Sequence, residues 1–216
     1  MNLPTKITFS RIIATVLLII ALFVMSLLDF EAPTLGNTGI NLVFLIIFIF
    51  FVIASYTDHL DGHLARKNNQ VTNLGKFLDP VADKLLINSM VIFLIAPWAF
   101  ARYAPQQIIS FNMWCVIILV VRDIVVDALR FIAAQKKVVI AANIFGKMKT
   151  VFEMVAISFV LLNGFPFNYF DASWPVGLHI TDIIVYFTTA MSFISGVIYV
   201  WQNRKVFLED KEEKGE

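Results

Sequence analysis

Four aspartates in the first half of the chain fall into two closely spaced pairs. The members of the first pair stand three residues apart and those of the second pair four residues apart: they are Asp58, Asp61, Asp79 and Asp83. On a helix, positions three or four residues apart share one face. If two antiparallel helices carry these pairs, the four carboxylates meet at one end of the helix pair.

Carboxylates gathered in this way repel one another and require positive charge nearby. The lysines of the same stretch, Lys67, Lys76 and Lys84, could supply it. Two divalent cations would balance the four charges more compactly, and carboxylate oxygens suit Mg²⁺ or Mn²⁺. The sequence therefore predicts a site for two divalent cations, Mg²⁺ or Mn²⁺, held by the four aspartates.

A purely structural interpretation of the same aspartates is open at this point. Asp79 precedes Pro80, so it could cap a helix that has proline at its first position. Asp58 and Asp61 could form a solvated helix end. Neither role explains Gly62, because a glycine at a helix end usually indicates the close approach of another helix or a ligand.

A second group of charges lies within an apolar stretch and in the connection that follows it. The group consists of Arg122, Asp123, Asp127, Arg130, Lys147 and Lys149. Charges inside a membrane span are costly and usually face an interior cavity. Internal arginine–aspartate pairs that hold helices together are one interpretation. The two lysines have only Glu153 as a further nearby acid, so we expect a basic pocket for a phosphorylated ligand beside the metal site.

The elements that must position these residues are apolar segments of about the length that crosses a bilayer. Six occur, at 9–28, 40–57, 81–100, 112–134, 148–165 and 181–202. The third is expected to begin earlier, near Thr72, and the fifth is short. Residues Leu3 to Ser10 mix polar and apolar side chains, which predicts a short interfacial helix. We predict an all-α integral membrane protein with six transmembrane helices and one domain, 1–216, ending in a charged tail at 209–216.

Composition agrees with a membrane protein. The chain is 59% hydrophobic and only 15% charged, whereas soluble domains are about one quarter charged. The net charge of +1 gives no electrostatic basis for binding nucleic acid. The single cysteine, Cys115, cannot form an internal disulfide.

The basic residues predict the orientation of the spans. The segments 1–11, 58–84, 130–149 and 204–216 hold 2, 4, 5 and 4 of the 17 lysines and arginines. These segments are expected on the same side of the membrane. Because basic residues concentrate on the cytoplasmic side, we predict a multi-pass protein with both termini and the active site facing the cytoplasm.

The stretch from Asp58 to Asp83 resembles the signature of the CDP-alcohol phosphotransferase family, D-x-x-D-G-x-x-A-R-x8-G-x-x-x-D-x-x-x-D, at every fixed position. The resemblance implies that the protein moves a phosphatidyl group from a CDP-lipid to a small alcohol. It also implies that the four aspartates bind two divalent ions, which bind the diphosphate of the CDP-lipid, and that Asp83 takes the proton from the attacking hydroxyl. The residues that it implies for CDP-lipid binding are Thr5, Thr8, Gly62, Arg66 and Thr72.

Three further segments, 2–11, 122–130 and 146–150, are similar to the phosphatidylglycerophosphate synthases of this family. The similarity implies CDP-diacylglycerol and sn-glycerol 3-phosphate as substrates. The residues that would bind the acceptor's phosphate are then Arg122, Arg130, Lys147 and Lys149. The chain departs from the subfamily at Thr5, Asp123 and Glu153, where Asn, Glu and Gln are common.

Alternatives remain at this stage. The same chemistry could use another acceptor, such as inositol phosphate or phosphatidylglycerol. A divalent-cation transporter would also bury acids in helices, although transporter sites usually lie near the bilayer midplane. The resemblance is also compatible with a homodimer, for which the third and fourth apolar segments offer a surface.

Overall fold

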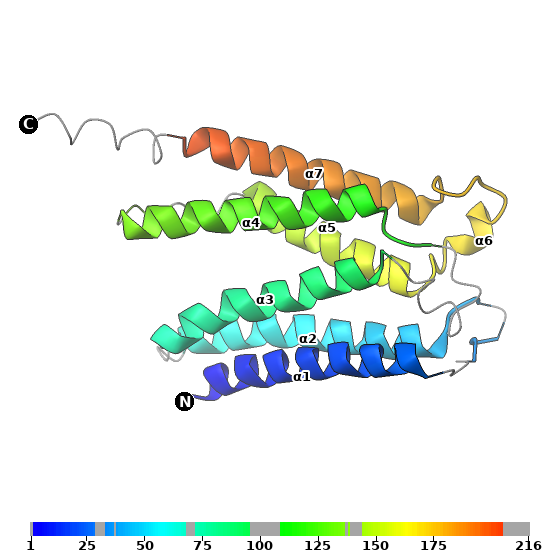
Figure 1. The fold of residues 1–216 in the computed structure, drawn as a ribbon, viewed down its shortest axis with the longest axis horizontal. Coiled ribbons are helices and arrows are strands. Elements are labelled where there is room, and N and C mark those ends of the chain that lie inside the picture. Colours follow the sequence, from blue (N-terminus) through cyan, green and yellow to red (C-terminus); the bar gives the residue numbers. More distant parts are fainter. Residues whose placement is uncertain are drawn as a thin grey trace, which may run out of the picture.

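The computed structural model describes residues 2–28, 33–36, 38–67, 72–95, 109–136, 138 and 144–204, without the side chains of 3, 59–67, 73, 76, 144, 145 and 147. The regular secondary structure of the described part is helical, apart from one antiparallel bridge between Thr34 and Asn41. Its helices, labelled in Figure 1, are α1 Leu3–Leu27, α2 Leu42–Lys67, α3 Asn73–Phe93, α4 Met113–Gln135, α5 Ile144–Leu161, α6 Asn168–Asp171 and α7 Ile180–Gln202.

Each apolar segment of the sequence contributes to one long helix. The early start of α3 is confirmed, because Thr72 caps the helix and its hydroxyl accepts a hydrogen bond from the Gly75 amide at 2.9 Å. The short α6 was not predicted.

The prediction of a separate interfacial helix at Leu3 to Ser10 is wrong. Helix α1 runs without a break from Leu3 to Leu27. Pro4 fits at its start, where a backbone N–H has no helical partner. Thr5 and Thr8 are 3% and 1% exposed. The first turns therefore pack against other helices rather than lying on a lipid surface.

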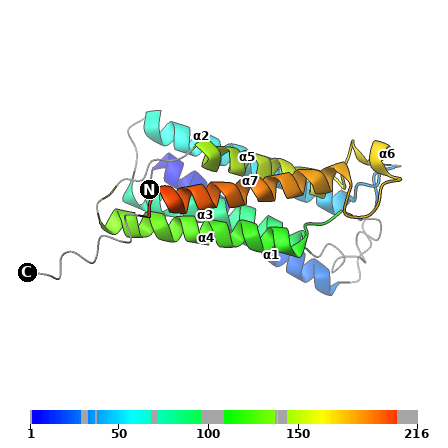
Figure 2. The same cartoon turned by 90° about the horizontal axis from the view of Figure 1, so that it is seen from above.

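The helices form a bundle of two groups (Figures 1 and 2). Helix α1 packs against α2 and α3, whereas α4 and α5 both pack against α7. Contacts of α2 with α5, and of α3 with α4 and α5, join the groups. The start of α1, the end of α2, the start of α3 and the end of α4 lie at one end of the bundle, and α6 lies at the other. The aspartate helices and the charged part of α4 therefore meet at the same end.

The outer surface of the bundle is strongly apolar. Large side chains such as Leu17, Phe23 and Trp201 are 58%, 62% and 68% exposed. Two described helices, Pro4–Leu27 and Ile180–Gln202, are long and apolar enough to cross a membrane. Exposed apolar surface on this scale points to a lipid environment. The count of six spans stays a prediction.

Candidate active site

Helix α1 connects the two helices that carry the aspartates. Arg11, 4% exposed, forms an ion pair with Asp58 of α2. Thr8 donates a hydrogen bond from its hydroxyl to Asp79 Oδ1 of α3 at 3.0 Å. The first half of α1 therefore helps to hold the aspartate pairs together.

The same helix also supports the start of α3. The Thr5 and Thr72 hydroxyl oxygens are 3.0 Å apart. A Cβ atom at Gly75 would lie 3.1 Å from Thr72 Oγ1 and 3.4 Å from Thr5 Oγ1. The glycine of the sequence motif thus leaves room for two of the predicted CDP-lipid-binding threonines.

Neither structural interpretation of Asp58 and Asp79 holds. Helix α2 continues to Lys67, so Asp58 is not at a helix end. Thr72 is the cap of α3, so Asp79 lies inside the helix, one turn before Asp83. Helix capping and a helix-end position therefore do not account for these two aspartates.

Three other predicted residues belong to the same stretch. Asp61, Gly62 and Arg66 lie in helix α2, but their side chains are outside the described part.

Among the described side chains, the aspartates Asp58, Asp79 and Asp83 outnumber the cations that pair with them. Asp83 lies close enough to Asp58 for their carboxylates to repel each other, and it makes no hydrogen bond or ion pair with a described residue. Lys84 does not compensate these aspartates, because it pairs with Asp127 of α4. That part of the lysine alternative is wrong, and Arg11 is the cation found there instead.

The donor set fits hard divalent cations, because it consists of carboxylate oxygens, and among the described residues only Asp58 has a cationic partner. Among the described side chains, however, no three acids form a metal-binding group. Asp61 is outside that set, and metal binding stays a prediction.

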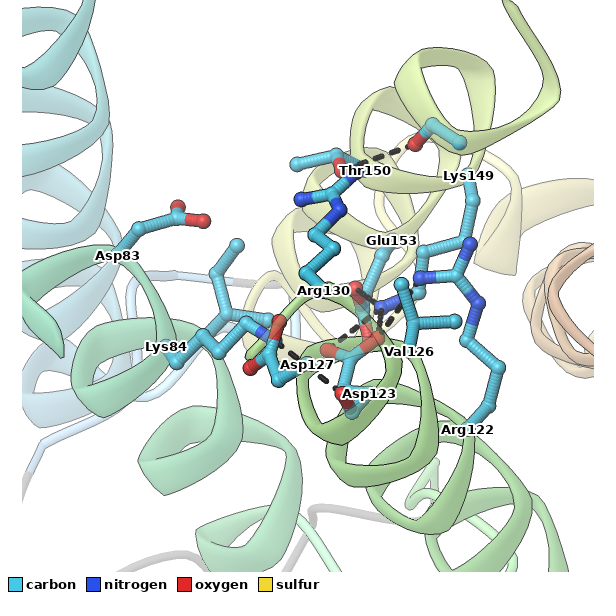
Figure 3. Close-up of a pocket in the computed structure, with 12 residues that line it drawn as sticks. Asp83, Lys84, Arg122, Asp123, Val126, Asp127, Arg130, Lys149, Thr150 and Glu153 are labelled. Atoms are coloured by element: carbon cyan, nitrogen blue, oxygen red, sulfur yellow. Dashed lines mark hydrogen bonds and ion pairs between the residues drawn. The ribbon is translucent and has the colours of Figure 1, made fainter. Parts of the chain in front are cut away.

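A cavity of about 200 Å³ lies between α3, α4 and α5, beside the aspartates (Figure 3). Its lining consists of Asp83, Lys84, Ile87, Arg122, Asp123, Val126, Asp127, Arg130, Gly146, Lys149, Thr150 and Glu153. The structure therefore brings Arg122, Arg130 and Lys149 together with Asp83, as predicted. The side chain of Lys147 is outside the described part.

Asp123 is the centre of the ion pairs in this cavity. Its carboxylate accepts hydrogen bonds from Lys149 Nζ at 2.9 and 3.0 Å and from Arg122 Nη1 at 3.1 Å. Arg122 Nη2 also donates to Ser195 Oγ of α7 at 2.9 Å. Lys149 Nζ lies 2.5 Å from Glu153 Oε2. These contacts fix the two cations between α4, α5 and α7.

The expected excess of basic residues is wrong for the described lining. The acids Asp83, Asp123, Asp127 and Glu153 equal in number the bases Lys84, Arg122, Arg130 and Lys149. The alternative of internal pairs is partly correct, since such pairs connect α4 to α3 and α5. If metals take up the charge of Asp83, the rest of the lining has one more cation than anions.

Arg130 differs from the other cations because it has no carboxylate partner in the described structure. Its Nε donates to the Tyr199 hydroxyl at 3.2 Å, and its guanidinium lies 5.7 Å from the centre of that ring. Asp127, an aspartate of the same helix, pairs with Lys84. Arg130 is therefore available to a ligand anion.

Sequence reasoning assigned no role to Arg11, Ser195 or Tyr199. Arg11 could have been found, because a cation at the start of an apolar helix requires an anionic partner. The two residues of α7 carried no such signal, since serine and tyrosine are ordinary components of apolar helices.

Comparison with known proteins relates the whole site, and not the aspartate motif alone, to one protein family. The sequence model of the CDP-alcohol phosphatidyltransferase family matches residues 1–198. The chain belongs to this family. The matched range runs from α1 into α7 and includes both the aspartates and the cavity.

Relatives of similar length carry one common name, CDP-diacylglycerol–glycerol-3-phosphate 3-phosphatidyltransferase. The one from Bacillus subtilis (strain 168) is 36% identical over 202 residues, which cover 94% of this chain and 95% of the relative. That from Mycoplasma pneumoniae is 37% identical, with 93% and 87% covered. That from Rickettsia bellii is 32% identical, with 95% and 97% covered. The predicted family is confirmed.

Proposed function

We propose that this phosphatidyltransferase transfers a phosphatidyl group from CDP-diacylglycerol to sn-glycerol 3-phosphate, giving phosphatidylglycerophosphate and CMP. The observation that carries the proposal is the shared cavity, which is lined by Asp83 together with Arg122 and Arg130. The names of the relatives support both substrates.

The size and chemistry of the cavity favour a small phosphorylated acceptor. Its volume of about 200 Å³ is below the roughly 300–1,000 Å³ of pockets for drug-sized ligands. A guanidinium can give two parallel hydrogen bonds to a phosphate. Arg130 has no carboxylate partner, and Arg122 Nε is buried without a hydrogen bond in the described structure. We assign the acceptor's phosphate to these two arginines and to Lys147 and Lys149.

Divalent cations are part of the proposal. Asp58, Asp61, Asp79 and Asp83 would hold two Mg²⁺ or Mn²⁺ ions, since their donor type and excess charge fit such ions. The ions would supply charge stabilisation for the diphosphate and for departing CMP.

The residues of the chain orient the reactants. Thr5, Thr8, Gly62, Arg66 and Thr72 would bind the CDP-lipid. Asp83 would receive the proton of the attacking hydroxyl. The hydroxyl oxygen forms a bond to the lipid-linked phosphorus, and the bond from that phosphorus to the CMP oxygen breaks. Because transfer depends on alignment, the cavity contributes mainly by fixing the hydroxyl near Asp83.

The proposed setting is a membrane crossed by all six long helices, with both termini and the cavity on the cytoplasmic side. The distribution of basic residues supports this orientation. It gives the cavity access to a water-soluble acceptor from the cytoplasm and to a lipid donor from the bilayer.

An acceptor panel tests the proposal. The purified full chain in detergent would be supplied with CDP-diacylglycerol, Mg²⁺ or Mn²⁺, and one of glycerol 3-phosphate, inositol phosphate or phosphatidylglycerol. CMP release is expected with glycerol 3-phosphate far above the other acceptors and above an acceptor-free control. Preference for another acceptor would refute the substrate assignment. Divalent-cation flux in proteoliposomes without CMP release would favour a transporter.

A further inference from the structure

Glu153 is a buried acid of the cavity that the proposed reaction does not use. Its side chain is 1% exposed and lies on α5, one turn after Lys149. Oε2 forms an ion pair with Lys149 Nζ at 2.5 Å, whereas Oε1 has no hydrogen-bond partner in the described structure. A carboxylate shielded from water normally accepts several hydrogen bonds. Among the described side chains, none donates to Glu153 Oε1, and this oxygen is free to accept a hydrogen bond from a ligand.

The Lys149 ammonium and the terminal nitrogens of Arg122 have other hydrogen-bond acceptors. Lys149 directs two hydrogen bonds to Asp123. Arg122 directs one terminal nitrogen to Asp123 and the other to Ser195. In Figure 3 the side chains of Glu153, Lys149 and Asp123 converge between α4 and α5, at the wall of the cavity. In the described structure the hydrogen bonds of these two cations are thus directed toward Asp123 and Ser195 and not toward Glu153 Oε1.

Three walls of the cavity present three different groups. Asp83 comes from α3, Arg122 from α4 and Glu153 from α5. Glycerol 3-phosphate also has three polar groups, namely the reacting hydroxyl, the phosphate and a second hydroxyl between them. With the reacting hydroxyl at Asp83 and the phosphate at the cations of α4 and α5, Glu153 is the carboxylate of the α5 wall that is left for the second hydroxyl.

We propose that Glu153 is a specificity-determining residue, whose carboxylate accepts a hydrogen bond from the non-reacting hydroxyl of the acceptor. This inference rests on the proposed function and names the group that the site recognises besides phosphate. A site that hydrogen-bonds a substrate hydroxyl rejects the analogue that lacks it, because its own polar group is then left unpaired.

The competing role is that of a counter-ion, in which Glu153 only holds Lys149 in place. The two roles differ in one measurable respect. A counter-ion affects every phosphorylated acceptor alike, whereas a hydroxyl acceptor affects only ligands that carry the second hydroxyl.

The test compares two acceptors on the full-length protein in detergent. Glycerol 3-phosphate has the second hydroxyl, and 3-hydroxypropyl phosphate lacks it but keeps the reacting hydroxyl and the phosphate. kcat/KM would be measured from CMP release for the wild type, Glu153→Gln and Glu153→Ala. Ser158→Ala is the matched control, because Ser158 is also on α5, bonds only to the Met154 carbonyl at 2.8 Å and does not line the cavity.

The wild type and Ser158→Ala are expected to prefer glycerol 3-phosphate by about ten- to a hundredfold. Glu153→Ala should reduce this preference to about twofold or less. Glu153→Gln should retain part of it, because an amide oxygen still accepts but carries no charge. If Glu153→Ala does not fold, a several-fold fall in preference for the near-isosteric Glu153→Gln supports the inference.

Equal losses with both acceptors, leaving the preference unchanged, would overturn the inference and make Glu153 a counter-ion. A wild type without preference would overturn it as well. A wild type that uses neither acceptor would instead refute the proposed function, so the two failures are distinguishable.

Discussion

Mutation of Arg122 distinguishes most clearly between a ligand-binding role and a structural role in this cavity. Its guanidinium bonds to Asp123 and Ser195, and its buried Nε has no hydrogen bond in the described structure. Its stem passes over Gly196, where a Cβ atom would lie 2.8 Å from Arg122 Cγ. We expect Arg122→Ala to impair use of the acceptor far more than it impairs folding.

The magnitude follows from the contacts that are lost. A forked contact to phosphate consists of two charge-assisted hydrogen bonds of about 1.5–3 kcal/mol each. Loss of both costs at least about 3 kcal/mol, or about 10²-fold in kcat/KM for the acceptor. The free energy of unfolding is expected to fall less than this, because Asp123 keeps both hydrogen bonds from Lys149 and is not left as an unpaired buried charge. The lost hydrogen bond to Asp123 is charge-assisted, so the expected loss of stability is about 2–3 kcal/mol.

The assay measures kcat and KM separately for glycerol 3-phosphate and CDP-diacylglycerol, together with Tm in detergent. The KM for glycerol 3-phosphate should rise strongly, while that for the CDP-lipid changes little. Arg122→Lys should rescue only partly, because an ammonium cannot form the fork. Arg204→Ala is the matched control, since it removes an exposed arginine that stacks on Trp201 at 4.6 Å.

A second variant is designed to displace the same guanidinium without removing its charge. Gly196→Ala would push a methyl group against the Arg122 stem and should also raise the acceptor KM. Damage to both substrates' kinetics alike, with a loss of stability nearer the 3–5 kcal/mol of a broken buried ion pair, would assign Arg122 a structural role. An unchanged acceptor KM in Arg122→Ala would refute the phosphate assignment.

The remaining predictions concern the metals, the base and the orientation. EDTA should abolish CMP release and added Mg²⁺ or Mn²⁺ should restore it; full turnover of washed protein in chelator would contradict the metal site. Asp83→Asn should lower kcat by about 10²–10⁴-fold and weaken CDP-lipid binding less; near-normal kcat with poor binding would make Asp83 a ligand only. A cysteine replacing Val176, which is 83% exposed, should react with an impermeant thiol reagent on intact cells. One replacing Phe77, which is 67% exposed, should react only after permeabilisation, with little background from buried Cys115. The reverse pattern would refute the orientation.

The sequence by itself determined the features that depend on local spacing. Hydropathy located the long helices, because each must present apolar side chains over its whole length. The motif spacing predicted that Asp79 and Asp83 stand one turn apart on a helix that begins near Thr72, and this is confirmed. The charged residues of α4 were expected to face a cavity because exposure to lipid is costly, and four of them line it.

Only the tertiary structure decided which charges meet. Arg11 contacts Asp58 across 47 positions of sequence, and Lys84 contacts Asp127 across 43. Such pairs depend on how each helix is rotated about its axis and how far it slides along its neighbours. Spacing within a single helix contains neither quantity. The same packing turns Thr5 and Thr8 inward, which is why α1 begins as a packed helix rather than an interfacial one.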